Sequence, residues 1–170
     1  MSLSMYQASA PRFANTLKNL SALLDKTQAH CEAKKIDPLA ITSSRLFPDM
    51  FPFNRQIYIA TDTAKGAVSR LAGIEIPKYE DTETTIPELK ARLAKTIDFV
   101  MSVPAAKIEG SAEKDISMKI AGKDTVLKGA QYLLGHAYPN FYFHCTTAYN
   151  ILRHNGVEIG KRDFLGTIVL

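Results

Sequence analysis

Three polar side chains recur at four-residue steps in the segment GAQYLLGHAYPNFYFHCTTAYNILRHNG, which covers residues 129–156. They are His136, Asn140 and His144. Residues four apart lie on one face of an α-helix, so these ring nitrogens and amide groups converge if the segment is helical. A row of this kind is typical of a metal site, a catalytic pocket or a buried hydrogen-bond network.

Distance separates the first member of this row from the last. Positions eight apart lie about 12 Å apart along a helix, so His136 and His144 cannot bind one ion. Pro139 predicts a bend between them, with the carbonyl of Gly135 left free. His144 is the candidate catalytic or metal-binding residue because histidine titrates near neutral pH. The competing interpretation of His144 is a buried histidine satisfied by a polar network.

The remaining histidines and the cysteines carry weaker signals. His30 and His154 fall near predicted helix ends, where an imidazolium interacts favourably with the helix dipole. Cys31 and Cys145 form no closely spaced motif, so neither a disulfide framework nor a cysteine-rich zinc site is indicated. Cys145 directly follows His144, but adjacent helical residues point about 100° apart, so a catalytic Cys–His pair is not predicted.

Four long helices are predicted from apolar residues that recur at three and four positions. Thr85 and Glu88 match a capping box at the start of the third, Pro104 ends it, and Gly73 ends the second. A period-two pattern predicts a hairpin before the last helix, and Asp37-Pro38 begins a short extra helix. The predicted long helices span about residues 4–33, 53–72, 86–102 and 129–156, the short helix 38–44 and the hairpin 114–127.

These elements predict an all-α protein, with residues 1–170 forming a single helical-bundle domain. Helices of this length pack best as a four-helix bundle. Two long connections, at about 34–52 and 73–85, allow a topology other than simple up-and-down. The tail after residue 156 has no strong helix pattern and is expected to dock on the bundle or on a partner.

The composition and charge of the chain argue against two classes of function, nucleic-acid binding and membrane association. The chain has 46% hydrophobic and 22% charged residues, as is ordinary for a globular protein, and a net charge of +4. Its basic residues are scattered, which argues against nucleic acid as a partner. No apolar run approaches the roughly 18 residues that span a bilayer, so no membrane association is expected. The first residues do not form a convincing secretory signal, and we expect a cytoplasmic location.

Several motifs together resemble an uncharacterised family in the DinB-like superfamily: PDMFPFNRQI, AKGAVSRLAG, the TETT start of the third helix, and PNFYFHCTTAYNILRHNG. The resemblance implies a four-helix bundle with a crossover between its second and third helices, and homodimerisation. Many superfamily members bind a divalent metal through three histidines, one on the second helix and an HxxxH pair on the fourth. Some relatives are transferases or isomerases that use a low-molecular-weight thiol.

Carried over by position, the HxxxH pair falls on Asn140 and His144, and the second-helix histidine falls on or near Gln56. Two of three expected ligands are therefore amides, which bind zinc or nickel poorly. The family pattern thus predicts a pocket formed by Gln56, Asn140 and His144. Asp49 and Asp62 flank the Gln56 region, and capping or surface roles are expected for both.

Three functions remain open at this stage. The first is a homodimeric bundle protein whose pocket binds a small molecule, with a degenerate metal site in which His144 is the remaining ligand and no cofactor is expected. The second is a divalent-metal- or thiol-dependent transferase or isomerase that recruits His136 or Asp49 as a further ligand. The third is a non-catalytic dimeric structural protein that packs through the aromatic face of its last helix.

Overall fold

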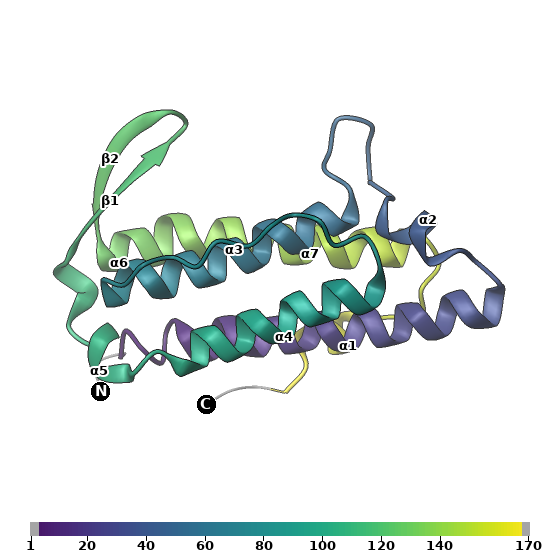
Figure 1. Ribbon diagram of the computed structural model, residues 1–170, viewed down its shortest axis with the longest axis horizontal. Helices are drawn as coiled ribbons and strands as arrows, with labels where there is room; N and C mark the ends of the chain where they lie inside the picture. The colour runs from purple at the N-terminus through teal and green to yellow at the C-terminus, as the bar shows by residue number, and fades with distance from the viewer. Residues whose placement is uncertain (1–3, 168–170) are drawn as a thin grey trace.

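The computed structural model describes residues 4–167 and confirms the four-helix bundle (Figure 1). The first three long helices are continuous, whereas the fourth contains a π-helical turn. The long elements are α1 (Ala10–Lys34), α3 (Phe53–Ala72), α4 (Ile86–Ser102) and the run of α6 (Gly129–Tyr132), η2 (Leu133–Ala137) and α7 (Tyr138–His154).

The helices follow an up-down-down-up order. In Figure 1, α1 and α7 run in one direction, and α3 and α4 run in the other. Each of α1 and α7 therefore has an antiparallel neighbour, since α1 packs chiefly on α4 and α3 packs chiefly on α7. Two parallel helices, α3 and α4, can be joined only by a segment that returns along the bundle. Residues 73–85 are that segment, and they confirm the expected crossover.

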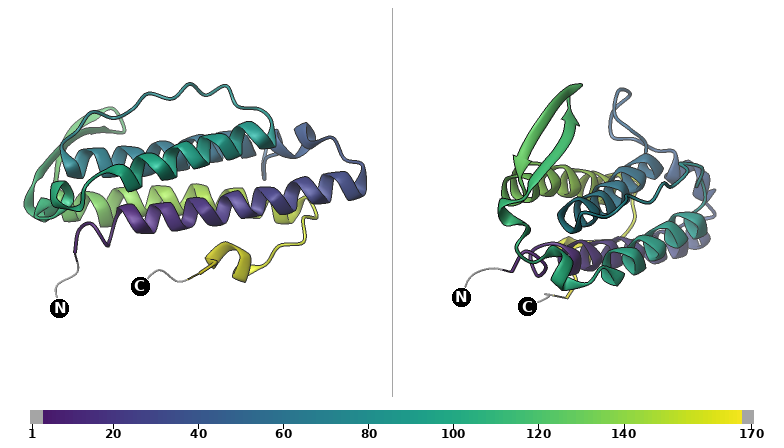
Figure 2. Two further views of the ribbon diagram at one scale, coloured as in Figure 1. Left: turned by 60° about the horizontal axis from the view of Figure 1, so that its bottom comes forward. Right: turned by 60° about the vertical axis from the view of Figure 1, so that its left-hand side comes forward.

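Short elements join the long ones. A hairpin rises beside the end of the bundle where α3 finishes, and its two strands pair in antiparallel register from Asp115 opposite Lys128 to Ile120 opposite Lys123 (Figure 2). Ala121 and Gly122 both have positive φ, as a two-residue hairpin turn requires. The short elements are α2 (Pro38–Thr42), α5 (Ala105–Ile108), η1 (Ser111–Glu113), β1 (Asp115–Ile120), β2 (Lys123–Lys128) and α8 (Lys161–Leu165).

Local sequence motifs predicted several helix ends that the structure confirms. The Thr85–Glu88 capping box is present, and Gly73 ends α3 with φ of 69°. The start of the first helix was predicted too early, because α1 begins at Ala10 rather than near Ser4. Pro11 explains the difference: it lacks an N–H and is tolerated in the first turn of a helix, where that donor has no partner.

The last helix departs from the prediction of one uniform helix with a bend at Pro139. The run from Gly129 to His154 is interrupted by the π-helical turn Leu133–Ala137, directly before Pro139. An α-helix would require an N–H at Pro139 to bond the carbonyl of Gly135, and a wider turn accommodates the missing donor. The short helix α8, which docks on α1, was also missed.

The core lies between the four long helices and is mostly apolar, with a few buried polar side chains among its apolar residues. Aromatic packing joins its first and last helices, since Phe13 of α1 contacts Phe141 of α7 edge to face at 4.8 Å between ring centroids. Both side chains are fully buried. Within residues 4–167, no helix is long and apolar enough to cross a membrane.

Candidate functional site

An imidazole and an amide meet between the second and fourth helices of the bundle. His144 lies in the middle of α7, and Gln56 lies in the first turn of α3. The antiparallel packing of these helices places Nδ1 of His144 2.7 Å from Oε1 of Gln56. Both side chains are buried, so neither group can replace this hydrogen bond with one to bulk water.

The orientation of the Gln56 amide is fixed by the backbone. Its Nε2 donates to the carbonyl oxygen of Phe51 at 2.9 Å, which leaves Oε1 to face His144. An amide oxygen can only accept, so Nδ1 of His144 must carry the proton that it donates. In the neutral ring, Nε2 is then an unprotonated acceptor. The tautomer of His144 therefore follows from the carbonyl of Phe51.

The second ring nitrogen of His144 is not fully buried. The structure gives it no hydrogen-bond partner among residues 4–167, and it is not one of the fully buried unpartnered atoms. Burial lowers the pKa of His144 below its ordinary value of 6.5. The imidazole is therefore neutral at physiological pH, and Nε2 offers a lone pair as a hydrogen-bond acceptor, a proton acceptor or a ligand atom.

A cavity of about 210 Å³ adjoins this pair, and we call it the His144 pocket. Its walls combine apolar side chains with one carboxylate. Phe51 and Phe143 are 47% and 57% exposed, so large apolar surface faces solvent at its mouth. The lining residues are Asp49, Met50, Phe51, Gln56, Phe143 and His144.

The loop that carries half of this lining is braced. The guanidinium of Arg45 donates to the carbonyls of Pro48 and Met50, at 3.4 and 3.2 Å. The Arg55 guanidinium lies 4.5 Å from the centroid of the Phe51 ring, a cation–π contact. The Arg45 bonds are internal to the loop, whereas the contacts of Phe51 with Arg55 and Gln56 attach its end to α3. The Phe51 carbonyl that orients Gln56 belongs to this braced loop.

Asn140, the third predicted pocket residue, makes a different contact. Its Nδ2 donates to Oγ1 of Thr63 at 2.8 Å, and it does not line the His144 pocket. Asn140 lies one turn before His144, and the antiparallel α3 therefore presents a later residue to it. Gln56 and His144 meet, while Asn140 lies further along the same helix pair.

The donor set does not match a three-imidazole metal site. His144 is the one imidazole at the pocket, the Gln56 oxygen already accepts its proton, and Asp49 is the nearby carboxylate. In the part of the chain that the structure describes, no group of three histidine, cysteine or acidic side chains could hold a metal ion. His136 is directed elsewhere and stacks on Tyr132, with 5.9 Å between ring centroids.

The other single residues have structural positions. His154 is exposed in the last turn of α7, and His30 lies near the end of α1. Cys31 and Cys145 are free and buried, and burial raises the pKa of each thiol. Asp62 contacts Lys65 and Arg92 rather than the His144 pocket.

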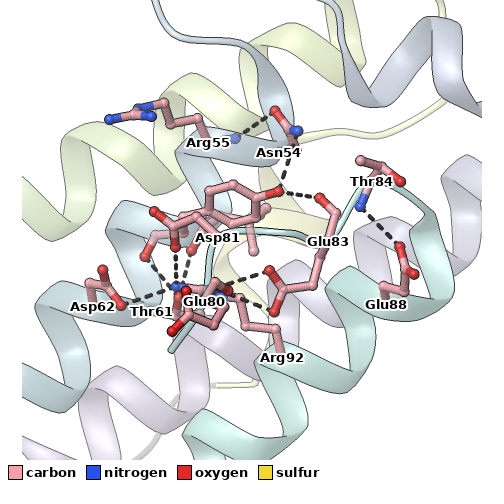
Figure 3. Close-up of polar contacts among 12 residues, drawn as sticks. Asn54, Arg55, Thr61, Asp62, Glu80, Asp81, Glu83, Thr84, Glu88 and Arg92 are labelled. Carbon is pink, nitrogen blue, oxygen red and sulfur yellow. Dashed lines mark hydrogen bonds and ion pairs between the residues drawn. The ribbon is translucent and has the colours of Figure 1, made fainter. Parts of the chain in front are cut away.

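Arg92 forms a second polar cluster, which the sequence analysis missed (Figure 3). Its side chain is 2% exposed, and it projects from α4 toward α3 and the crossover of residues 73–85. Every nitrogen of its guanidinium has a partner. These are Oγ1 of Thr61 at 2.8 Å, the Glu80 carbonyl at 2.9 Å, and the carboxylates of Asp62, Asp81 and Glu83 at 3.0 to 3.1 Å.

Aromatic rings complete this Arg92 cluster. Tyr58 and Tyr79 lie 4.7 and 5.4 Å from the guanidinium, and Lys95 lies 4.2 Å above the Tyr79 ring. The cluster satisfies its charges internally and attaches the crossover to two helices, which indicates a structural role. The sequence contains a pattern that could have identified Arg92. It lies three residues after Leu89 and four before Thr96, which places it on the inward face of its helix.

The helix order and the crossover, together with the structural comparison below, define a DinB-like four-helix bundle. The family assignment is more specific: the chain belongs to the family described as a domain of unknown function, DUF1993, which matches residues 5–165. The chain is also similar to the crystal structure of a DinB family member protein from Shewanella denitrificans. That comparison gives 42% identity over 96% of this chain and 92% of the other, with a TM-score of 0.90. No curated protein matches the chain.

Proposed function

We propose that this protein binds a small organic molecule in the His144 pocket, and that the three-histidine metal site of the wider superfamily is degenerate here. One observation carries the proposal. The Phe51 carbonyl, the Gln56 amide and the His144 imidazole form a hydrogen-bonded chain that ends in an accessible, unprotonated ring nitrogen beside a cavity. Convergent polar groups beside an apolar cavity are the usual composition of a ligand site.

The lining of the pocket is suited to a ligand whose main part is apolar and uncharged. Met50, Phe51 and Phe143 supply apolar contact, and burial of such surface gives most of the affinity for a small molecule. His144 supplies one oriented polar contact. A neutral imidazole can also accept a proton from a bound ligand, so the same atom can act as a general base if the ligand is a substrate.

The competing function is a metal-dependent transferase, and Asp49 is the observation that favours it. Asp49 lines the same pocket as His144, so one acidic residue and one histidine border it. Two such ligands bind zinc or nickel more weakly than a complete set of three or four. Activity on thiol conjugates that is lost on chelation would support this alternative.

Metal analysis separates the two functions. Protein purified without an affinity tag or chelators is analysed by mass spectrometry for zinc and nickel, alongside the His144→Ala variant. We expect substoichiometric metal that is equal in both proteins. Stoichiometric metal in the wild type that disappears in His144→Ala would overturn the degenerate-site proposal.

We also propose that the protein is a homodimer. Leu134 and Phe143, on the last helix, are each 57% exposed, and association would remove this apolar surface from water. Light scattering coupled to size-exclusion chromatography measures the mass directly. A mass near 38 kDa, twice the 18.8 kDa of the chain, is expected, and a mass of one chain at micromolar concentration would contradict the proposal.

A further inference from the structure

The atoms available in the His144 pocket point to the class of ligand. We propose that the pocket recognises small apolar molecules through an O–H or N–H donor on the ligand, with Nε2 of His144 and the Asp49 carboxylate as acceptors. The inference rests on the proposed ligand-binding function and adds the chemical class of the ligand. Alcohols and amines share the required donor, whereas ethers and carboxylates of the same shape lack it.

The first step is the fixed tautomer of His144. A histidine with two free ring nitrogens can donate or accept at either one, and it selects no ligand polarity. Here Oε1 of Gln56 accepts from Nδ1, and the Phe51 carbonyl prevents the amide from reversing. Nε2 can then only accept. A ligand with an acceptor in this place would leave two lone pairs facing each other.

The second acceptor is Asp49. Asp49 is an exposed residue that lines the pocket, and the structure gives its carboxylate no ion pair or hydrogen bond with residues 4–167. An ionised carboxylate accepts hydrogen bonds and donates none. Arg45 and Arg55 are the nearest arginines of the same segment. The first binds loop carbonyls and the second stacks on Phe51, and neither lines the pocket.

The third step is size. A cavity of about 150 Å³ lined by apolar side chains is large enough to hold benzene. The His144 pocket measures about 210 Å³, so one ring with a short polar group fits it. Met50, Phe51 and Phe143 would contact the ring, while the polar group reaches His144. Benzyl alcohol and benzylamine are therefore suitable probes.

A matched series of four ligands tests the inference. Binding of benzyl alcohol, benzylamine, benzyl methyl ether and benzoate is followed by NMR titration of backbone amides and of the His144 ring. We expect the alcohol and the amine to bind about 5- to 10-fold more tightly than the ether, the effect of one hydrogen bond. Benzoate should bind most weakly.

The possible failures are distinguishable. If the ether binds as tightly as the alcohol, the donor inference is wrong while the ligand-binding function stands. If none of the four perturbs residues around the pocket at millimolar concentration, the proposed function itself is contradicted. Tighter binding of benzoate than of the alcohol would also overturn the inference.

The tautomer provides a readout that a purely structural role would not change. Nitrogen-15 spectra of His144 in the wild type should show a protonated Nδ1 and an unprotonated Nε2. In Gln56→Met the fixed acceptor is lost, so Nε2 should gain proton occupancy and the preference for alcohol over ether should disappear. An Nε2–H tautomer in the wild type would overturn the inference even if no variant folds.

Asp49→Asn separates the two ligand types. The substitution removes the negative charge and keeps the size of the side chain. Benzylamine, which is cationic at neutral pH, should then bind about 2- to 5-fold more weakly, as expected for loss of an exposed ion pair. Benzyl alcohol should weaken less than benzylamine, because the amide oxygen of asparagine still accepts a hydrogen bond from an O–H group. Equal weakening of both ligands would contradict a charge contact between Asp49 and the amine.

Discussion

Gln56 and His144 are 88 positions apart in the chain, yet Oε1 of one and Nδ1 of the other are 2.7 Å apart. The pair joins the first turn of α3 to the middle of α7, and it connects the loop before α3 to the core of the bundle. A side-chain contact between buried groups on two helices depends on the whole topology. Its chemistry can therefore be tested through stability as well as through binding.

Acid should destabilise the protein through His144. Because burial lowers the pKa of His144 below 6.5 in the folded state, the unfolded chain binds a proton more readily. The free energy of unfolding should therefore be unaffected by His144 above pH 6.5. It should fall as the pH is lowered from 6.5 toward the folded pKa. Urea unfolding between pH 5 and 7.5 measures this dependence.

His144→Phe supplies the comparison for that experiment. Phenylalanine has no titrating group, so the variant should show a flatter pH dependence over the same window, whatever its absolute stability. NMR titration of the His144 ring in the wild type should give a midpoint below 6.5. A wild type that gains stability on acidification relative to the variant would show that the assigned pKa direction is wrong.

Loss of the Gln56 side-chain amide should lower the free energy of unfolding. Gln56→Met keeps the length of the side chain but leaves the Phe51 carbonyl and the His144 ring nitrogen without a partner. We expect a loss of about 2 kcal/mol in the free energy of unfolding, as for a buried group left unsatisfied. The matched control is Gln28→Met in α1, where the amide contacts Glu32 on the surface and a change within about 0.5 kcal/mol is expected. Equal effects at the two positions would mean that the buried pair adds no stability.

Removal of the Arg92 guanidinium should release the crossover. Arg92→Met leaves Asp62, Asp81 and Glu83 close together without their shared cation. The expected loss is about 3 kcal/mol, the lower end for a broken buried ion pair, because the three acids are partly exposed. Urea unfolding measures this loss, and limited proteolysis should show new cleavage within residues 73–85.

The surface residue Arg162 provides the control for that substitution. It is exposed on α8, so Arg162→Met should change the free energy of unfolding by less than about 0.5 kcal/mol and leave the proteolysis pattern unchanged. If Arg92→Met unfolds like the control and its crossover resists protease, the cluster does not attach the crossover.

Neither cysteine should react in the folded protein. Cys31 and Cys145 are 1% and 0% exposed, and burial raises the pKa of both thiols, so little thiolate is present or accessible. Iodoacetamide at pH 8 should leave both unmodified, as read by intact mass, and should label both in urea. The exposed position Ala91 offers a positive control, because Ala91→Cys should be labelled without denaturant. Rapid native labelling of Cys145 would imply that α7 opens locally.

Most of the scaffold could be predicted from the sequence because its signals are local. Residues 53–72 and 86–102 carry an apolar stripe between a clear start and stop, and both helices were predicted at their observed bounds. The start of α1 was predicted too early, since the residues between Ser4 and Ala10 form turns that lead into the helix. The helix α8 has five residues, too few for a period to show.

The contacts of the candidate site could be predicted only in part from the sequence. The position of Gln56 opposite His144 came from the family resemblance, because no periodicity reports contacts between helices. Asn140 shares a helical face with His144, but the register of α3 against α7 decides that Thr63, not the pocket, faces it. The partners of Arg92, which is on α4, come from α3 and the crossover, and their meeting depends on the path of residues 73–85. Tertiary register, rather than local pattern, sets these contacts.

The π-helical turn at Leu133–Ala137 has an evolutionary consequence. Such a turn holds one residue more than the α-helical turn it replaces, so it is equivalent to a single-residue insertion. Removing one residue there, with Pro139 replaced by a residue that has an N–H, would restore regular α-helix while α7 and the hairpin keep their orientations. We expect homologues to differ in length by one residue at this place, with the face that carries His144 unchanged.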